Sequence, residues 1–124
     1  MKKTHNSDKL SALGPYSHGV AAQGETVYLS GQLGINHRTK EMGADINAQT
    51  RFALENVQLL LSELGLEMKD VVKTLVLLKD IADFQEMNQV YSEFFTEEAP
   101  ARSAFQVGAL PNNGLVEIEV IAVR

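Results

Sequence analysis

PARS at residues 100–103 and LVEIEVIAV at residues 115–123 are the two stretches around which this sequence is organised. Arg102 is the only arginine between Arg51 and the last residue of the chain. It stands where an apolar strand is about to begin, and the later stretch predicts a second strand that carries Glu117. A cation at the mouth of one strand, opposite a strand with a carboxylate, favours a site that grips an anionic small molecule.

The bulk composition bounds the class of protein. A chain of 124 residues is long enough for one domain, residues 1–124, with its own hydrophobic core. With 44% hydrophobic and 22% charged residues, it is typical of globular rather than disordered proteins. The net charge of -5 argues against a nucleic-acid partner, because phosphate binding needs a basic stripe.

The chain has no cysteine, which excludes disulfides, thiolate nucleophiles and cysteine-ligated metal sites. Its basic start, Met1-Lys2-Lys3, is followed by polar residues and not by the apolar core of a signal peptide. An apolar run such as residues 75–78 is far too short to cross a bilayer. We therefore expect a cytoplasmic protein with no membrane partner.

Hydrophobic periodicity and turn residues predict the order of elements. Residues 1–14 have only a weak strand tendency, and Gln23-Gly24-Glu25 predicts a hairpin turn between the first two strands. Asp45 is a candidate N-cap of the first helix and Gly65 its C′ residue, whereas either Asp80 or Asp83 is a candidate cap of the second. The predicted elements are strands at 16–22 and 26–30, a helix at 46–64, a strand at 71–78, a helix that ends before Pro100, and strands at 103–107 and 115–123.

This order predicts a two-layer α+β domain, in which two helices cover one face of a mixed sheet. Residues 71–78 are apolar on both faces and belong in the middle of that sheet. In residues 115–123 neither face is fully polar, and a single layer of helices cannot cover both. We therefore expect self-association through the uncovered face.

Several kinds of site are disfavoured by the pattern. The three histidines, His5, His18 and His37, are scattered, with no paired spacing for a metal ion. No glycine-rich phosphate loop opens a helix, and the serines lack a nearby His and Asp in a familiar arrangement. We therefore expect no metal ion.

Arg102 and Glu117 remain as the candidate chemical groups. An arginine fork fits a carboxylate in two parallel charge-assisted hydrogen bonds. An internal salt bridge between Arg102 and a glutamate explains the same pattern equally well. Glu117 and Glu119 share one face of their strand, and a solvated strand edge accounts for them without any function.

These residues carry a family resemblance that covers nearly the whole chain in order. PARSAFQVGAL at residues 100–110, followed by VEI at 116–118, resembles the C-terminal signature of the Rid/YjgF family, whose members include 2-iminobutanoate/2-iminopropanoate deaminases. GPYSH at 14–18 resembles its N-terminal motif, and SGQ at 30–32 its second-strand motif. Further matches fall at Val72-Lys73-Thr74, Lys79-Asp80, Asn88, Tyr91 and Phe94-Phe95.

The resemblance implies a chorismate-mutase-like fold and a homotrimer, with six-stranded sheets facing inward and sites in the clefts between subunits. It implies that Arg102 binds the substrate carboxylate, that Glu117 orients the attacking water and that the backbone of Ala104 contacts the substrate. The remaining pocket residues that it implies are Tyr16, Ser30, Gly31 and Asn88.

The implied reaction is hydrolysis of reactive 2-imino or enamine acids to 2-oxo acids and ammonia, without a cofactor. Three departures from the family pattern stand out: Ala104 replaces a common cysteine, Gly34 a common proline, and the link from Phe95 to Pro100 is short. Two other functions stay open, namely a non-catalytic module that binds 2-oxo acids and an RNA-directed ribonuclease or translation inhibitor. The acidic balance disfavours the last of these.

Overall fold

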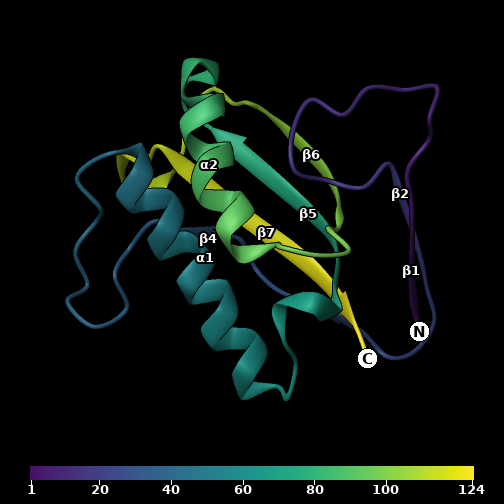
Figure 1. Ribbon diagram of the computed structural model, residues 1–124. Coiled ribbons are helices and arrows are strands. Elements are labelled where there is room, and N and C mark those ends of the chain that lie inside the picture. Colours follow the sequence, from purple (N-terminus) through teal and green to yellow (C-terminus); the bar gives the residue numbers. More distant parts are fainter.

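Two helices lie on one face of a mixed β-sheet in the computed structural model, which describes residues 1–124 (Figure 1). The helices are α1 (Ile46–Glu63) and α2 (Phe84–Phe94). The strands are β1 (Lys2–His5), β2 (Gly19–Ala22), β3 (Thr26–Tyr28), β4 (Gln32–Leu33), β5 (Val71–Leu78), β6 (Ala101–Gln106) and β7 (Val116–Val123). Three short 3-10 turns are η1 (Met68–Asp70), η2 (Ile81–Asp83) and η3 (Pro111–Asn113). The predicted α+β class is confirmed.

Strand β7 is the hub of the main sheet, which has five strands. It pairs antiparallel with β5 on one side and with β3 and β4 on the other. On its far side β5 pairs in parallel with β6, so that β5 lies inside the sheet as its apolar sequence predicts.

The predicted hairpin around Gly24 is wrong, although Gly24 does take a positive φ of 143°. Strand β2 pairs with β1 in a separate two-stranded sheet, whereas β3 pairs with β7. The residues that flank the glycine diverge accordingly, because the Gln23 N–H donates to the Met1 carbonyl and the Glu25 N–H to the Arg124 carbonyl. The structure therefore has a sheet of five strands and a separate sheet of two, and not the single six-stranded sheet that the resemblance implies.

The β1–β2 hairpin is attached at the edge of the main sheet where β6 begins. Ser17 forms a parallel bridge with Ala101, and its hydroxyl donates to the Ala99 carbonyl at 2.5 Å. These contacts shorten the strand predicted at 16–22 and start β6 two residues earlier than predicted. Gln32, which lies outside the strand predicted at 26–30, begins β4 beside Ile118.

Both ends of α1 follow the predicted capping residues. The Asp45 carboxylate accepts a hydrogen bond from the Ala48 N–H at 2.8 Å. Gly65 takes a φ of 75°, and the N–H of Leu66 donates back to the Leu61 carbonyl at 2.8 Å, which closes the helix in a Schellman motif. At α2, Asp83 occupies the N-cap position without a side-chain hydrogen bond. No helix combines the length and apolarity that a bilayer crossing requires.

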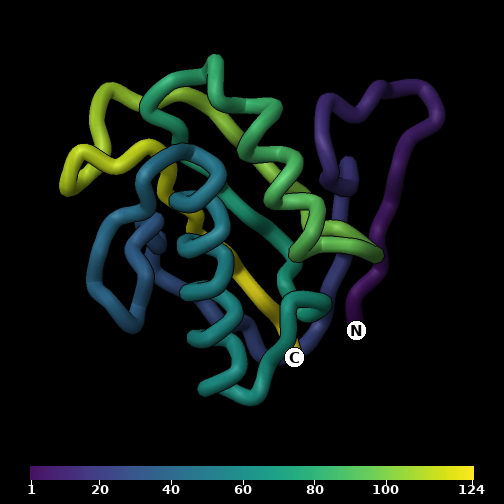
Figure 2. Tube along the Cα trace, turned by 60° about the vertical axis from the view of Figure 1, so that its left-hand side comes forward, coloured from purple at the N-terminus to yellow at the C-terminus, as the bar shows by residue number.

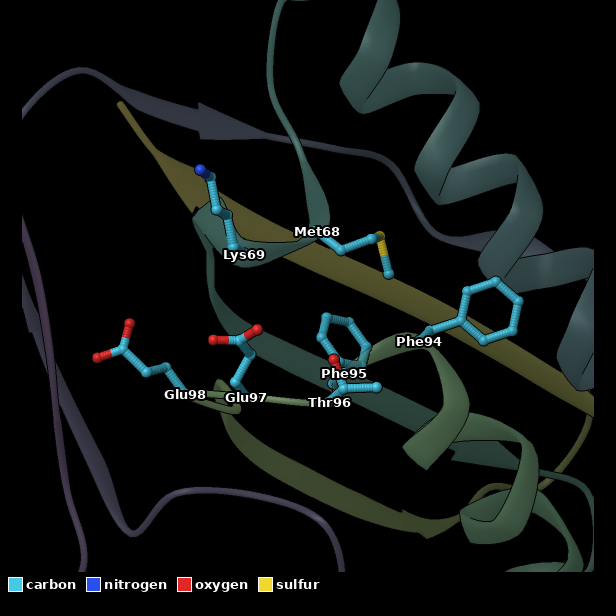
Figure 3. Close-up of a pocket in the computed structure, with 7 residues that line it drawn as sticks. All are labelled: Met68, Lys69, Phe94, Phe95, Thr96, Glu97 and Glu98. Carbon is cyan, nitrogen blue, oxygen red and sulfur yellow. The ribbon is translucent and has the colours of Figure 1, made fainter.

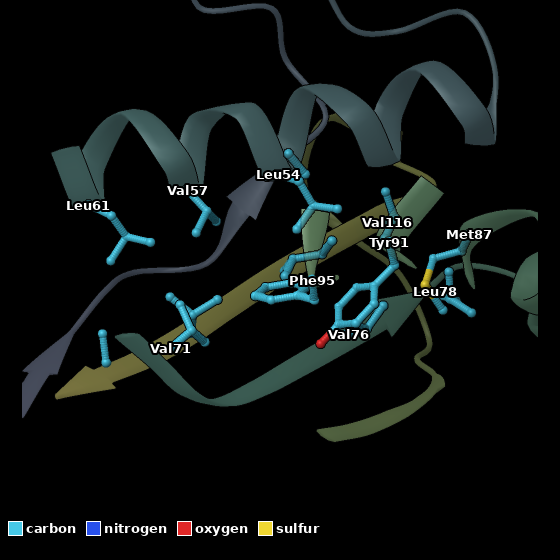
Figure 4. Packing of buried hydrophobic residues seen from close by; sticks show 14 of the residues in the cluster. Leu54, Val57, Leu61, Val71, Val76, Leu78, Met87, Tyr91, Phe95 and Val116 are labelled. Carbon is cyan, nitrogen blue, oxygen red and sulfur yellow. The ribbon is translucent and has the colours of Figure 1, made fainter. Parts of the chain in front are cut away.

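The core lies between the helices and the inner face of the sheet. Leu54, Val57 and Leu61 of α1 point onto that face, as Figure 4 shows. The fully buried residues on that face of the sheet are Thr74, Val76, Leu78, Val116, Ile118 and Val120. Strand pairing sets this face, because Thr74, Val76 and Leu78 of β5 lie directly opposite the three β7 residues.

No helix lies on the other face of the sheet, which we call the open face (Figure 2). Its residues alternate with the buried ones and include Tyr28, Lys73, Leu75, Leu77, Phe105, Glu117, Glu119 and Ile121. Tyr28 and Phe105 are 74% and 46% exposed, which is unusual for large apolar side chains on a sheet. The self-association expected from the sequence stays a prediction, and the open face is where it would occur.

Candidate functional site

Arg102 lies on the inner face of the sheet, against α2. As the second residue of β6 it pairs with Thr74 of β5 and so faces the helix layer. Its Nη1 donates to Asn88 Oδ1 at 2.7 Å. Three aromatic rings surround the guanidinium carbon: Tyr91 at 4.7 Å, Tyr16 at 5.5 Å and Phe84 at 5.6 Å from the ring centroids.

No carboxylate neutralises Arg102. The ion pairs of the structure are Arg51–Glu93, Lys69–Glu67 and Arg124–Glu25, which excludes the internal salt bridge that the sequence left open. Burial lowers the pKa of the guanidinium below its usual value, and Tyr91 and Tyr16 offset part of that shift, yet an arginine stays charged. The Nε and Nη2 donors of Arg102 have no acceptor in the chain, so they are available to a ligand anion.

Tyr91 packs its ring against the guanidinium of Arg102. Its ring is fully buried, and its hydroxyl shares a 2.8 Å hydrogen bond with the Thr74 hydroxyl. Burial raises the pKa of Tyr91 to about 12, against the opposing effects of the Thr74 hydrogen bond and the Arg102 charge. The phenol therefore stays neutral and supports the cation without neutralising it.

Gly14 forms the opposite wall. A Cβ built there would lie 2.5 Å from Arg102 Nη2 and 3.2 Å from Asn88 Nδ2. The main chain can approach the guanidinium this closely only because the residue has no side chain.

A small pocket of about 170 Å³ opens beside the guanidinium. Its lining residues are Leu13, Tyr16, Phe84, Arg102 and Ala104. The structure thus brings together four of the predicted site residues, namely Tyr16, Asn88, Arg102 and Ala104, around one cation.

Glu117 lies on the opposite face of the sheet. It pairs with Leu77 of β5, which points to the open face, and a Cβ at Gly31 would overlap its carboxylate. Ser30 precedes this contact and is exposed. The predicted residues therefore form two groups, and Arg102 does not meet Glu117 within one chain.

Sequence reasoning missed three residues of the Arg102 group. Phe84 and Tyr91 lie on α2 at a helical spacing of apolar residues that is typical of core, and only the register of β6 shows that they also flank a cation. Leu13 comes directly before the GPYSH motif, and this adjacency was its only signal.

A larger hollow, of about 350 Å³, lies between η1 and the link after α2 (Figure 3). The carboxylates of Glu97 and Glu98 stand on one side of it and the ring of Phe94 on the other. It includes none of the predicted site residues. No group of three or more His, Asp or Glu side chains is arranged to hold a metal ion.

Comparisons with known proteins place the chain in a family. A family model described as Endoribonuclease L-PSP matches residues 6–124. The 2-iminobutanoate/2-iminopropanoate deaminase of Escherichia coli (strain K12) is 44% identical over 117 residues, which cover 92% of this chain and 91% of that protein.

Two solved structures share the fold. RidA from the Antarctic bacterium Psychrobacter sp. superposes with a TM-score of 0.79 at 41% identity, over 98% of this chain and 99% of that one. Escherichia coli TdcF with bound serine gives a TM-score of 0.77 at 39% identity, with the same shares of the two chains. The chain therefore belongs to the Endoribonuclease L-PSP family, and its resemblance to Rid/YjgF proteins is confirmed.

Proposed function

We propose that this protein hydrolyses 2-imino acids such as 2-iminopropanoate and 2-iminobutanoate to 2-oxo acids and ammonia. The observation that carries the proposal is the unneutralised Arg102, whose free donors face a small pocket. A carboxylate is the anion that such a fork fits best. Relatives named as deaminases of these imines, and a relative with bound serine, point to the same class of ligand.

We further propose that the working unit is a homotrimer with its sites between subunits. Support comes from the division of the predicted residues, because Arg102 and Glu117 lie on opposite faces of one sheet. A neighbouring copy whose Arg102 pocket lies against the open face would meet Ser30, Gly31 and Glu117 of this chain. The exposed apolar residues of that face are consistent with such an interface.

In this proposal each group has a simple task. Arg102 and the backbone of Ala104 hold the carboxylate end of the substrate, Tyr16 lines the pocket, and Asn88 orients the guanidinium by accepting its hydrogen bond. Glu117 orients a water whose oxygen adds to the imine carbon, while the imine nitrogen takes up a proton. The resulting carbinolamine releases ammonia as its hydroxyl becomes the carbonyl of the 2-oxo acid. No cofactor is required, because the imine is already an electrophile.

The first test compares ammonia release from imines generated in solution by an amino-acid oxidase. We expect Arg102→Ala to reduce the rate to the uncatalysed value, because the substrate loses its charged anchor. Arg38→Ala, at an exposed loop position, is the matched control and should retain wild-type activity. If wild-type protein binds 2-oxobutanoate but does not raise the rate above the uncatalysed value, the result would favour a binding module over a deaminase. Salt-sensitive RNA binding would favour the RNA-directed function instead.

Mixing two inactive variants tests the shared site. In mixed trimers of Arg102→Ala and Glu117→Gln chains, about a quarter of the clefts should pair an intact Arg102 with an intact Glu117 from the neighbour. Activity near that fraction supports a site made by two chains. Mixtures as inactive as either parent would contradict it.

A further inference from the structure

We propose that Leu13 is a specificity-determining residue, which with Phe84 selects substrates whose side chain is apolar and uncharged. This inference rests on the proposed function, because it concerns the same Arg102 pocket. It assigns a role to a residue that the reaction itself does not use.

The pocket has one charged group and otherwise apolar walls. Arg102 is its only ionisable cation, and the rest of its lining comes from Leu13, Tyr16, Phe84 and Ala104. Once Arg102 holds the carboxylate that all 2-imino acids share, the remaining space faces carbon atoms. At about 170 Å³ this space suits a short chain, since pockets for drug-sized ligands measure roughly 300–1,000 Å³.

Leu13 is held at the pocket rim by its backbone. Its N–H donates to the Tyr16 hydroxyl at 3.0 Å, and Tyr16 itself stacks near Arg102. The next residue, Gly14, packs its main chain against the guanidinium. The Leu13 side chain is nevertheless 77% exposed, so it has free apolar surface at the edge of the site. A substrate side chain in the pocket would cover that surface.

The same lining residues disfavour a substrate whose side chain carries a second negative charge. A terminal carboxylate placed among Leu13 and Phe84 would lose water without gaining a cation, since the pocket offers none besides Arg102. Discrimination against dicarboxylic substrates follows from the lining alone.

Calorimetric binding of four 2-oxo acids tests the inference without requiring turnover. Pyruvate, 2-oxobutanoate and 2-oxopentanoate differ by one methylene each, and 2-oxoglutarate has the length of 2-oxopentanoate with a terminal carboxylate. In wild type we expect affinity to rise by up to about fourfold per methylene and to fall at least tenfold for 2-oxoglutarate. Leu13→Ala should flatten the rise along the series and leave pyruvate binding within about twofold.

Leu10→Ala is the matched control, because Leu10 belongs to the same segment, is 65% exposed and does not line the pocket. It should reproduce the wild-type series. Equal affinities across the four acids, or a Leu13→Ala series identical to that of Leu10→Ala, would overturn the inference even if imine hydrolysis is observed. A graded series without hydrolysis would instead refute the proposed function and leave the inference standing, and absence of both would refute both.

Discussion

At the residue scale, Arg102 is held by neighbours that contribute a hydrogen bond and aromatic faces but no negative charge. A paired arginine would have little to gain from an anionic ligand, because its Coulomb attraction is already satisfied. Because Arg102 has no carboxylate partner, its charge can attract an anionic ligand from solution. The surrounding rings exclude part of the water, which strengthens that attraction.

Gly14 is the residue whose replacement should disturb this arrangement most specifically. In Gly14→Ala the new methyl group would collide with Arg102 Nη2 and press on Asn88. We expect ammonia release to fall by about 10- to 100-fold, because misplacement of a binding group by about 1 Å has that effect. Circular dichroism should show an unchanged fold.

Gly19→Ala is the control for Gly14→Ala, since a Cβ at Gly19 meets no atom within 4 Å. Its activity should match that of wild type. A Gly14→Ala variant with normal activity would show that the exact position of the guanidinium does not limit the reaction.

At the scale of elements, the helices could be predicted well from the sequence. Asp45 and Gly65 predicted the two ends of α1 correctly, because capping is a local interaction of neighbouring residues. The strand partners could not be predicted in the same way. Gly24 does turn the chain, but Gln23 and Glu25 bond to Met1 and Arg124, which lie far away in sequence.

The candidate site was predictable only as a set of residues. The motifs gave Arg102, Glu117 and their companions, but the faces on which they lie depend on strand register, which pairs Arg102 with Thr74 and Glu117 with Leu77. A shift of one residue in either pairing would exchange the faces. No local feature of the sequence reports that register.

The two acidic residues at the helix starts allow a test at this scale. Asp45→Ala removes a carboxylate that accepts the Ala48 N–H, so the free energy of unfolding should fall by about 1 kcal/mol. Asp83→Ala removes the same charge from the N-cap of α2, where no such hydrogen bond exists, and should have a smaller effect. Urea denaturation at one fixed chain concentration measures both. Equal losses would mean that charge, and not the hydrogen bond, stabilises α1.

At the scale of the whole molecule, the open face is where the proposed self-association would occur. Leu75 lies at its centre, between Glu119 of β7 and Ser103 of β6. We expect Leu75→Glu to place an unpaired charge inside the proposed interface and to convert trimers to single chains. Sedimentation velocity reports the mass directly, and ammonia release should be lost in parallel.

Leu59→Glu is the control for Leu75→Glu, because Leu59 is 37% exposed on α1, away from the open face. It should leave the sedimentation coefficient unchanged. Wild-type protein that sediments as a single chain, or a fully active Leu75→Glu monomer, would contradict the shared site.

The central position of β7 has a further consequence for how the chain reaches its native state. The strand follows every other element in sequence, yet β3, β4 and β5 all bond to it. During synthesis from the N-terminus, those three strands leave the ribosome before the partner that joins them exists. The helices can form as they emerge, whereas closure of the main sheet must wait until residues 116–123 are available. Long-range pairing of this kind favours a slow final step of folding.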